Sequence, residues 1–524
     1  MIKAIAAAAA NRKTARNALF FFLGAQLVVA VFKIVEVYHH DLPVFHQIAW
    51  AGFAEPAAYA AILFNVLLIL LSFWASPLMG QYSILTAGGY GYLFYVSLLA
   101  LVNYFVAYCT GHFYAQVNWL FLAGLIPAGV GNFGVLKLRI SALNRNFRPG
   151  WFHNPGIYGW IVLVLLLTFL PFLIMPYHFF DAINSYAPKA FAIHATGNAQ
   201  AMAFVTQANK GINAASLAQG GAYPPLYPII LSLSMMGDHL FEGRIIPFLM
   251  FLSFIAVLLH RVPRNGFISR SFFLVYFIAT MQVWLGVANY YADVPLMIVG
   301  CAAGFLMLDT RSAGDLKADV VAITLFCAAA LMRPDGIVTV FCLLLCMFLS
   351  GIKKISWYGV AATLSLAAAL TWEFRPAWLR ILPGYGYLDT SQAANNISLG
   401  CGLHIRTVLN FLNAAQGLYL SHYGFGAFFY GFIIVLIAGI RTRLALGKDA
   451  LSYGIISVLA IGVLVCVYLF VGLFLNNVIP YPLMVRVSFG RATVHFFPFM
   501  LLFTVAIINA FFKTQESGLK SPVR

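Results

Sequence analysis

The sequence predicts an all-α membrane protein with about fourteen transmembrane helices, because long apolar runs alternate with short basic clusters along the chain. Hydrophobic residues make up 62% of the 524 positions and charged residues only 9%, whereas soluble domains carry roughly a quarter charged residues. Stretches such as 161–175 and 458–475 are almost continuously apolar and lack the alternation of a β-barrel strand. These observations exclude a water-soluble fold and a barrel.

The net charge of +16 is explained by topology rather than by a nucleic-acid partner. Lys and Arg residues lie in short clusters beside apolar runs, and the positive-inside rule places each cluster on the cytoplasmic side. The clusters are Lys3/Arg12/Lys13/Arg16, Lys137/Arg139/Arg145/Arg148, Arg261/Arg264/Arg270, Lys353/Lys354, Arg441/Arg443/Lys448 and Lys513/Lys520/Arg524. Both termini are therefore expected in the cytoplasm, with membrane lipids and no nucleic acid as partners.

The first block of expected helices covers residues 1–150. Its four helices span roughly 18–37, 57–76, 83–108 and 118–136. The first lacks a convincing cleavage site after its apolar run and is interpreted as a retained signal anchor. The basic linker 137–148 ends this block, which we interpret as an accessory bundle.

The second block, residues 151–524, carries about ten helices and the long outer loops. Its helices are expected near 157–175, 244–260, 271–288, 294–308, 318–332, 337–351, 356–372, 424–440, 451–475 and 492–512. The outer loops are 176–243, 373–423 and 476–491. Within the first loop, the apolar segment 223–236 is short and starts with clustered prolines, which predicts an interfacial helix on the outer surface.

Two of the 15 acidic residues stand out in the outer segments. Asp181 follows a predicted helix in FFDAINSYAPKAFAI, and Ser185 and Lys189 follow at a spacing that places all three on one helical face. Asp293 opens the next inward helix in NYYADVPL. From spacing alone, Asp181 and Lys189 also fit an ordinary interfacial pair in water. Asp293 also fits a residue that stabilises a helix N-terminus through the helix dipole.

Five short motifs occur in order within residues 157–512: FDAINSYAPKA, YPPLYPIIL, YYADVPL, LMRPDG and GRATVHFFP. In order, spacing and outer placement they resemble the GT-C glycosyltransferases, especially bacterial members related to the protein O-mannosyltransferase and aminoarabinose-transferase group. The resemblance implies a GT-C-like core that transfers a sugar from a polyprenyl-phosphate carrier to a lipid, glycan or protein acceptor. It also implies a bacterial inner membrane and an active site that faces the periplasm.

The resemblance assigns few residues to the chemistry. Asp181 matches the acidic residue of the family's first loop and would accept the proton of the attacking hydroxyl. Asp293 matches the second acidic residue, which in relatives supports the acceptor, the sugar or a divalent metal. Arg491 and His495 match the family's Arg-x-x-x-His-x-x-Pro ending, and Arg491 would stabilise the leaving phosphate. On its own, this pair also fits an interfacial arginine and a packed histidine.

Four further residues complete the expected substrate-binding set. Lys189 and Arg333 are candidate phosphate ligands, and Tyr186 and Tyr223 lie in the same motifs. The alternative for Lys189 is a side chain that only snorkels toward water. The alternative for Arg333 is an ion pair with Asp335 at a helix break.

The sequence leaves open whether a metal cofactor is needed and which class of reaction the protein performs. A divalent metal such as Mg²⁺ or Mn²⁺ at Asp181 and Asp293 stays open, because Ala182 stands where many relatives carry a second acidic residue. A transporter or flippase of a lipid-linked glycan would also have about fourteen helices. A glycan polymerase or ligase is another alternative to the glycosyltransferase, and a non-catalytic scaffold subunit is the last. The outer-loop arginines that keep the polymerase or ligase open are Arg375, Arg380 and Arg406.

Overall fold

The computed structural model describes most of the predicted helices. The described residues are 56–146, 186–199, 224–235, 243–262, 277, 292–309, 315–333, 336–349, 355–373, 409, 412–413, 432, 447–474 and 490–518. The predicted helices at 18–37 and 157–175 lie outside these residues, and those at 271–288 and 424–440 do so except for Phe277 and Phe432.

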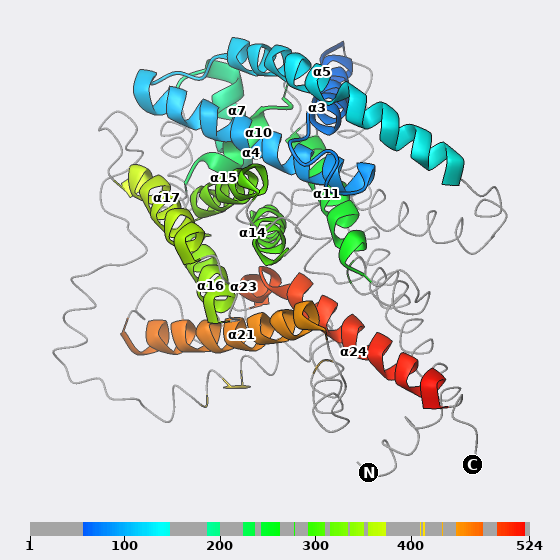
Figure 1. Ribbon diagram of the computed structural model, residues 1–524. Coiled ribbons are helices and arrows are strands. Elements are labelled where there is room, and N and C mark those ends of the chain that lie inside the picture. The colour runs from blue at the N-terminus through cyan, green and yellow to red at the C-terminus, as the bar shows by residue number, and fades with distance from the viewer. Residues whose placement is uncertain are drawn as a thin grey trace, which may run out of the picture.

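All extended regular structure within the described residues is α-helical, which confirms the predicted all-α class for this part of the chain. The helices drawn in Figure 1 are α3 (Pro56–Trp74), α4 (Ile84–Thr110), α5 (Ala115–Asn146), α7 (Ala187–Thr196), α10 (Leu226–Ser232), α11 (Ile245–Arg261), α14 (Asp293–Leu308), α15 (Leu316–Met332), α16 (Gly336–Leu349), α17 (Ile355–Glu373), α21 (Lys448–Phe474), α23 (Gly490–Val494) and α24 (Phe497–Gly518).

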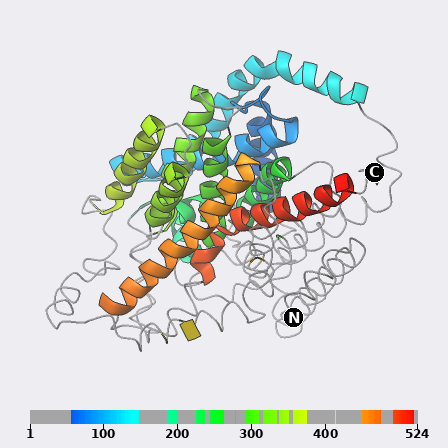
Figure 2. The ribbon, with the colours of Figure 1, turned by 60° about the horizontal axis from the view of Figure 1, so that its bottom comes forward.

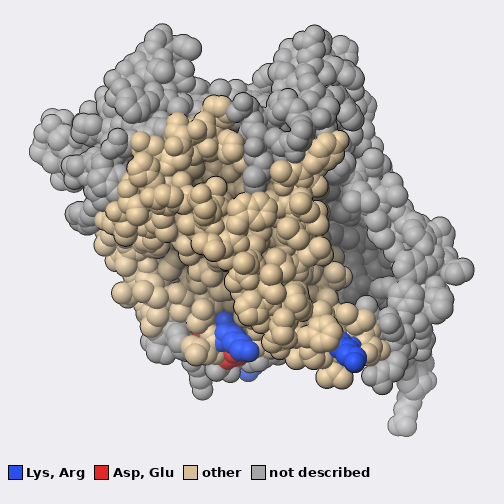
Figure 3. Space-filling view, turned by 90° about the horizontal axis from the view of Figure 1, so that it is seen from above, with Lys and Arg blue, Asp and Glu red and all other residues tan. Residues whose placement is uncertain are grey.

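Three stretches of the described chain are long and apolar enough to cross a membrane: Ile84–Thr110, Ala115–Ser141 and Lys448–Cys466. Large apolar side chains also face outward, as in α5, where Leu120 is 72% and Leu138 is 69% exposed. Figures 1 and 2 show α5 along the edge of the described helices. On the face in Figure 3, the coloured Lys and Arg side chains gather at one edge and the rest is almost free of charge. Such a surface suits lipid rather than water.

Helix α14 lies at the centre of the described helices (Figure 1). All its residues from Asp293 to Leu308 are buried, as expected for a helix that is apolar on every side. It packs against α15, α11, α16 and α23. Its two ends carry the exceptions to this apolar character, because Asp293 starts the helix and Asp309 caps it. Each of these two carboxylates lies in a buried polar cluster.

The helices of residues 56–146 share one hydrophobic core with the later helices. Helix α4 packs against α11, α15 and α10 as well as against α3. The hydroxyls of Tyr104 on α4 and Thr371 on α17 are hydrogen-bonded at 2.9 Å. The described helices of the N-terminal block are therefore in direct contact with those of the second block.

Three elements differ from their predicted form. The helix predicted at 118–136 continues to Asn146. The helix predicted at 492–512 is divided into α23 and α24 by a turn at His495 and Phe496, because Pro498 has no amide hydrogen with which to continue the helix. The predicted interfacial helix exists as the short α10, but residues Leu226 to Leu231 are buried by protein rather than lying on the surface.

Candidate functional site

A buried ion pair marks the point where α14 begins and α15 ends. Arg333 caps α15 in an extended conformation. Its Nη1 donates a hydrogen bond to Oδ1 of Asp293. Only 8% of Arg333 and 4% of Asp293 is exposed. Because a buried charge is costly without a partner, each of these residues stabilises the other in this position.

His495 joins this pair from the turn between α23 and α24. Its Nε2 lies 3.4 Å from Oδ1 of Asp293, and its Nδ1 lies 3.0 Å from the hydroxyl of Thr339 on α16. The backbone carbonyl of His495 accepts a hydrogen bond from Sγ of Cys301 at 3.1 Å. The hydrogen bond to Thr339 orients the imidazole, and the bond to Cys301 holds the backbone of the turn.

Two buried tyrosines contact each other, and one of them, Tyr227, is influenced by the charge of the same carboxylate. Tyr186, which caps α7, and Tyr227 on α10 meet edge to face with ring centroids 5.2 Å apart. Burial raises the pKa of the Tyr227 hydroxyl well above its ordinary range, the Asp293 carboxylate raises it further, and the Arg244 guanidinium lowers it. Tyr227 is therefore within electrostatic reach of both charges. We refer to Asp293, Arg333, Thr339, His495 and Tyr227 as the Asp293 cluster.

Two further buried cations belong to α7 and α11, which both contact α10, the helix that carries Tyr227. Arg244, at the start of α11, is 2% exposed, and Lys189, on α7, is 3% exposed. Lys189 lies three residues after Tyr186 and hence on the same face of that helix. Guanidinium and ammonium groups in a buried setting favour phosphate or another oxyanion as ligand.

A divalent cation does not fit the described residues of this cluster. Mg²⁺ and Mn²⁺ prefer several oxygen ligands, usually with more than one carboxylate. Asp293 is the single carboxylate of the cluster, and it already pairs with Arg333. Across the described residues there is no group of three or more His, Cys, Asp or Glu side chains that would hold a metal ion.

The structure brings together three of the predicted site residues: Asp293, Arg333 and His495. The alternative partner of Arg333, Asp335, lies outside the described residues, as do the predicted base Asp181 and the substrate-binding candidate Tyr223.

Other predicted residues are placed only in part. Tyr186 contacts Tyr227 next to the cluster, and Lys189 is buried on the same helix. The backbone of Arg491 lies in α23, one turn before His495. The side chain of Arg491 lies outside the described part.

Sequence reasoning missed Thr339, Tyr227 and Arg244. Tyr227 was within a quoted motif, YPPLYPIIL, but had no role assigned to it. Arg244 carried a usable signal, because a basic residue at a helix end assigned to the outer side is unexpected under the positive-inside rule. Thr339 carried none, since a threonine inside an apolar helix commonly bonds only to its own backbone.

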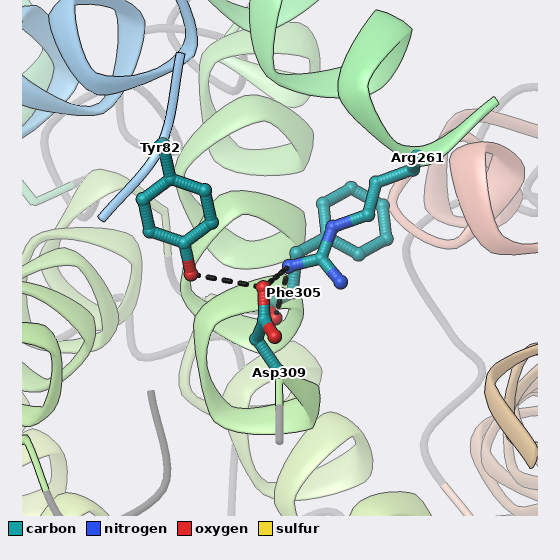
Figure 4. A network of polar contacts seen from close by, with 4 residues as sticks. All are labelled: Tyr82, Arg261, Phe305 and Asp309. Atoms are coloured by element: carbon teal, nitrogen blue, oxygen red, sulfur yellow. Dashed lines mark hydrogen bonds and ion pairs between the residues drawn. The ribbon is translucent and has the colours of Figure 1, made fainter. Parts of the chain in front are cut away.

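A second buried cluster lies at the opposite end of α14, drawn in Figure 4. The Tyr82 hydroxyl donates to Oδ2 of Asp309 at 2.9 Å, and Arg261 donates to the same oxygen at 3.0 Å. Arg261 also donates to the carbonyl of Phe305 at 2.8 Å, and its guanidinium lies 5.7 Å from the centroid of that ring. The Asp309 carboxylate thus accepts hydrogen bonds from Tyr82 and Arg261 within the same cluster. Such mutual bonding is typical of a network that stabilises the fold.

No family model, no curated protein and no solved structure matches this chain. The assignment of a function therefore depends on the motifs in the sequence and on the geometry of the Asp293 cluster.

Proposed function

We propose that this chain is an inverting GT-C-like membrane glycosyltransferase that moves a sugar from a polyprenyl-phosphate carrier to a lipid, glycan or protein acceptor. One observation carries the proposal. Asp293, Arg333 and His495, each taken from a different motif, meet in one buried cluster. Short motifs that occur by chance have no reason to converge in space.

The positions of the two clusters on α14 support a site on the non-cytoplasmic face. The three motif residues come from helix ends that the alternation of basic clusters assigns to the outer side. Tyr82, Arg261 and Asp309 come from ends that the same alternation assigns to the cytoplasm, and they contact one another. The contacts within each set, at opposite ends of α14, support this alternation of sides. We place the chain in a bacterial inner membrane with both termini in the cytoplasm, as the resemblance and the basic clusters imply.

The proposed reaction is a single displacement. The acceptor hydroxyl oxygen forms a bond to the anomeric carbon while the bond from that carbon to the phosphate oxygen breaks. Asp181 accepts the hydroxyl proton. The released electron pair stays on the lipid phosphate. Arg491, Lys189 and Arg333 stabilise the charge of that phosphate. Asp293 holds Arg333 and His495 in place for this role.

A transporter is less well supported by the described residues. Transporters place their ionisable groups near mid-membrane on interrupted helices. On α14, the buried carboxylates Asp293 and Asp309 lie at the two ends of the helix, and the residues between them are apolar.

The proposal is tested with purified protein in lipid nanodiscs, polyprenyl-phosphate sugars as donors, and mass spectrometry of the released polyprenyl phosphate. We expect turnover by the wild type and none by Asp181→Asn or Asp293→Asn. Asp309→Asn is the matched control, because it also neutralises a buried carboxylate on α14 that pairs with an arginine. It should keep turnover in the fraction of protein that folds.

Two outcomes would contradict the proposal. Equal turnover in Asp181→Asn and the wild type would remove Asp181 from the mechanism. Consumption of polyprenyl-pyrophosphate glycans alone would instead identify a glycan polymerase or ligase.

A further inference from the structure

Two turns of the chain share a short sequence pattern that the proposed function does not use. Thr110–Phe113 (TGHF) follows α4, and Thr196–Ala199 (TGNA) follows α7. In each, the threonine hydroxyl donates to the carbonyl four residues earlier, Val106 at 2.8 Å and Ala192 at 2.7 Å. It also accepts from the amide two residues later, at 3.2 Å for His112 and 3.1 Å for Asn198.

The glycine of each turn ends its helix in the same way. Gly111 has a φ of 80° and donates to Ala107 at 2.9 Å, and Gly197 has a φ of 61° and donates to Ile193 at 2.9 Å. Residues with a Cβ rarely adopt this left-handed conformation, so glycine is required at both caps.

The two turns are hydrogen-bonded to each other in a reciprocal manner. The amide of Phe113 donates to the carbonyl of Gly197 at 2.6 Å, and the amide of Ala199 donates to the carbonyl of Gly111 at 3.0 Å. His112 and Asn198 thus form an antiparallel bridge. Both partners satisfy carbonyls that helix ends would otherwise leave without a donor. We call the paired turns Thr110–Phe113 and Thr196–Ala199 the Thr–Gly latch.

The latch fixes a helix that is too short to be stable alone. Helix α7 has ten residues, fewer than the roughly 12–15 that an isolated helix needs to be even marginally stable in water. Helix α7 packs on α10, and α10 packs in turn on α4. At one end of α7, Tyr186 contacts Tyr227 of the Asp293 cluster, and the other end is joined to the N-terminal block by the latch.

We propose that the Thr–Gly latch makes the N-terminal helices a positioning element, which holds α7 so that Tyr186 stays against Tyr227 of the Asp293 cluster. The effect on turnover rests on the proposed glycosyltransferase function. Cross-linking and hydrogen exchange test the latch itself and need no enzymatic activity.

A cross-link tests the geometry of the latch. Residues directly opposed in an antiparallel bridge have Cα atoms about 4.5–5.5 Å apart, within the range that a disulfide spans. We expect His112→Cys with Asn198→Cys to cross-link on mild oxidation, in a Cys109→Ser background that removes the nearby native thiol. The offset pair Tyr114→Cys with Asn198→Cys is the control. Absence of a cross-link at 112 and 198 would overturn the latch.

A matched pair of glycine variants tests the positioning. In Gly197→Ala the new Cβ would lie 3.1 Å from the carbonyl oxygen of Phe113, inside the latch. Gly80→Ala introduces the same kind of strain at a φ of 100°, but its Cβ faces the Val135 side chain. We expect hydrogen exchange of residues 187–196 to rise at least fivefold in Gly197→Ala and to stay unchanged in Gly80→Ala. Unchanged exchange in both variants would overturn the proposal.

Rescue separates positioning from a general loss of stability. Oxidation of the 112–198 cysteine pair in the Gly197→Ala background should restore the exchange protection of α7 and at least half of the lost turnover, and reduction should remove both. Turnover loss that oxidation does not restore would contradict the positioning role. If the wild type transfers no sugar, the proposed function fails, whereas the exchange and cross-linking results still decide the latch.

Discussion

The imidazole of His495 connects Asp293 to Thr339, because Nε2 lies 3.4 Å from the carboxylate and Nδ1 lies 3.0 Å from the hydroxyl. Residues from three separate elements are thereby held in one arrangement. Orientation of a histidine through its second nitrogen is a recurrent means of fixing the group that acts.

Removing the Thr339 hydroxyl should lower turnover while the fold is kept. Thr339→Val preserves volume but removes one hydrogen bond of about 1 kcal/mol, so we expect kcat to fall roughly fivefold. Thr324→Val on α15 is the control, since that exposed hydroxyl bonds only to the carbonyl of Val320. Initial rates at saturating donor check this, and equal rates in both variants would show that His495 needs no support from Thr339.

The ion pair of Arg333 and Asp293 should show strong coupling. Arg333→Met leaves the buried carboxylate without its guanidinium partner, and we expect a loss of about 3–5 kcal/mol in the free energy of unfolding. Asp293→Asn in the same chain should recover part of that loss. Denaturant titration in mixed micelles measures the free energy of unfolding of the wild type, the two single variants and the double variant. Additive effects of the two changes would argue against a direct pair.

Tyr82 should make stability depend on alkaline pH. Burial raises the pKa of the Tyr82 hydroxyl, and the charge of Asp309 adds to the shift. The folded protein thus keeps this proton when the unfolded chain loses it near pH 10. The contribution is fully present below pH 10 and is lost as the pH rises toward the shifted pKa.

Tyr82→Phe should therefore flatten the fall of the melting temperature between about pH 9.5 and 11, the region around the ordinary tyrosine pKa. At pH 7.5 it should cost about 1 kcal/mol, the value of one hydrogen bond. Tyr114→Phe, at an exposed side chain, serves as the control. An unaltered alkaline slope in Tyr82→Phe would contradict this role.

The crossing of α4 and α11 should tolerate no side chain at Gly89. A Cβ there would lie 2.6 Å from the carbonyl oxygen of Ser253, so Gly89→Ala should separate the two helices and lower the melting temperature. At Gly124 on α5 a Cβ meets nothing within 4 Å, and Gly124→Ala should stabilise by up to about 1 kcal/mol through helix propensity. Equal effects of the two changes would show that α4 and α11 do not meet this closely.

Hydropathy and charge predicted the bounds of several described helices closely, because segments that span lipid must be apolar and long. The helix predicted at 294–308 is observed as Asp293–Leu308, and that predicted at 83–108 as Ile84–Thr110. The division at His495 was not predicted, because the apolar run continues through it and the effect of Pro498 depends on what packs around the turn.

The candidate site was predictable where a motif carried it. Asp293, Arg333 and His495 each stood in a motif, whereas no local pattern connected Thr339 to His495. The reciprocal bonding of the two Thr-Gly turns depends on how α4 and α7 meet in space. The periodicity of apolar residues predicts one helix at a time. It does not predict which helix ends contact each other in the folded chain.

Because α14 is fully enclosed and has only 16 residues, its length is about 24 Å at 1.5 Å per residue. The hydrocarbon core of a bilayer is thicker, at about 30 Å. If α14 crosses near the middle of the bilayer, both its charged ends lie below the level of the lipid headgroups, shielded by surrounding helices. A lipid-linked phosphate would then have to move several ångströms toward the bilayer centre to reach Asp293, so we expect turnover to depend on membrane thickness.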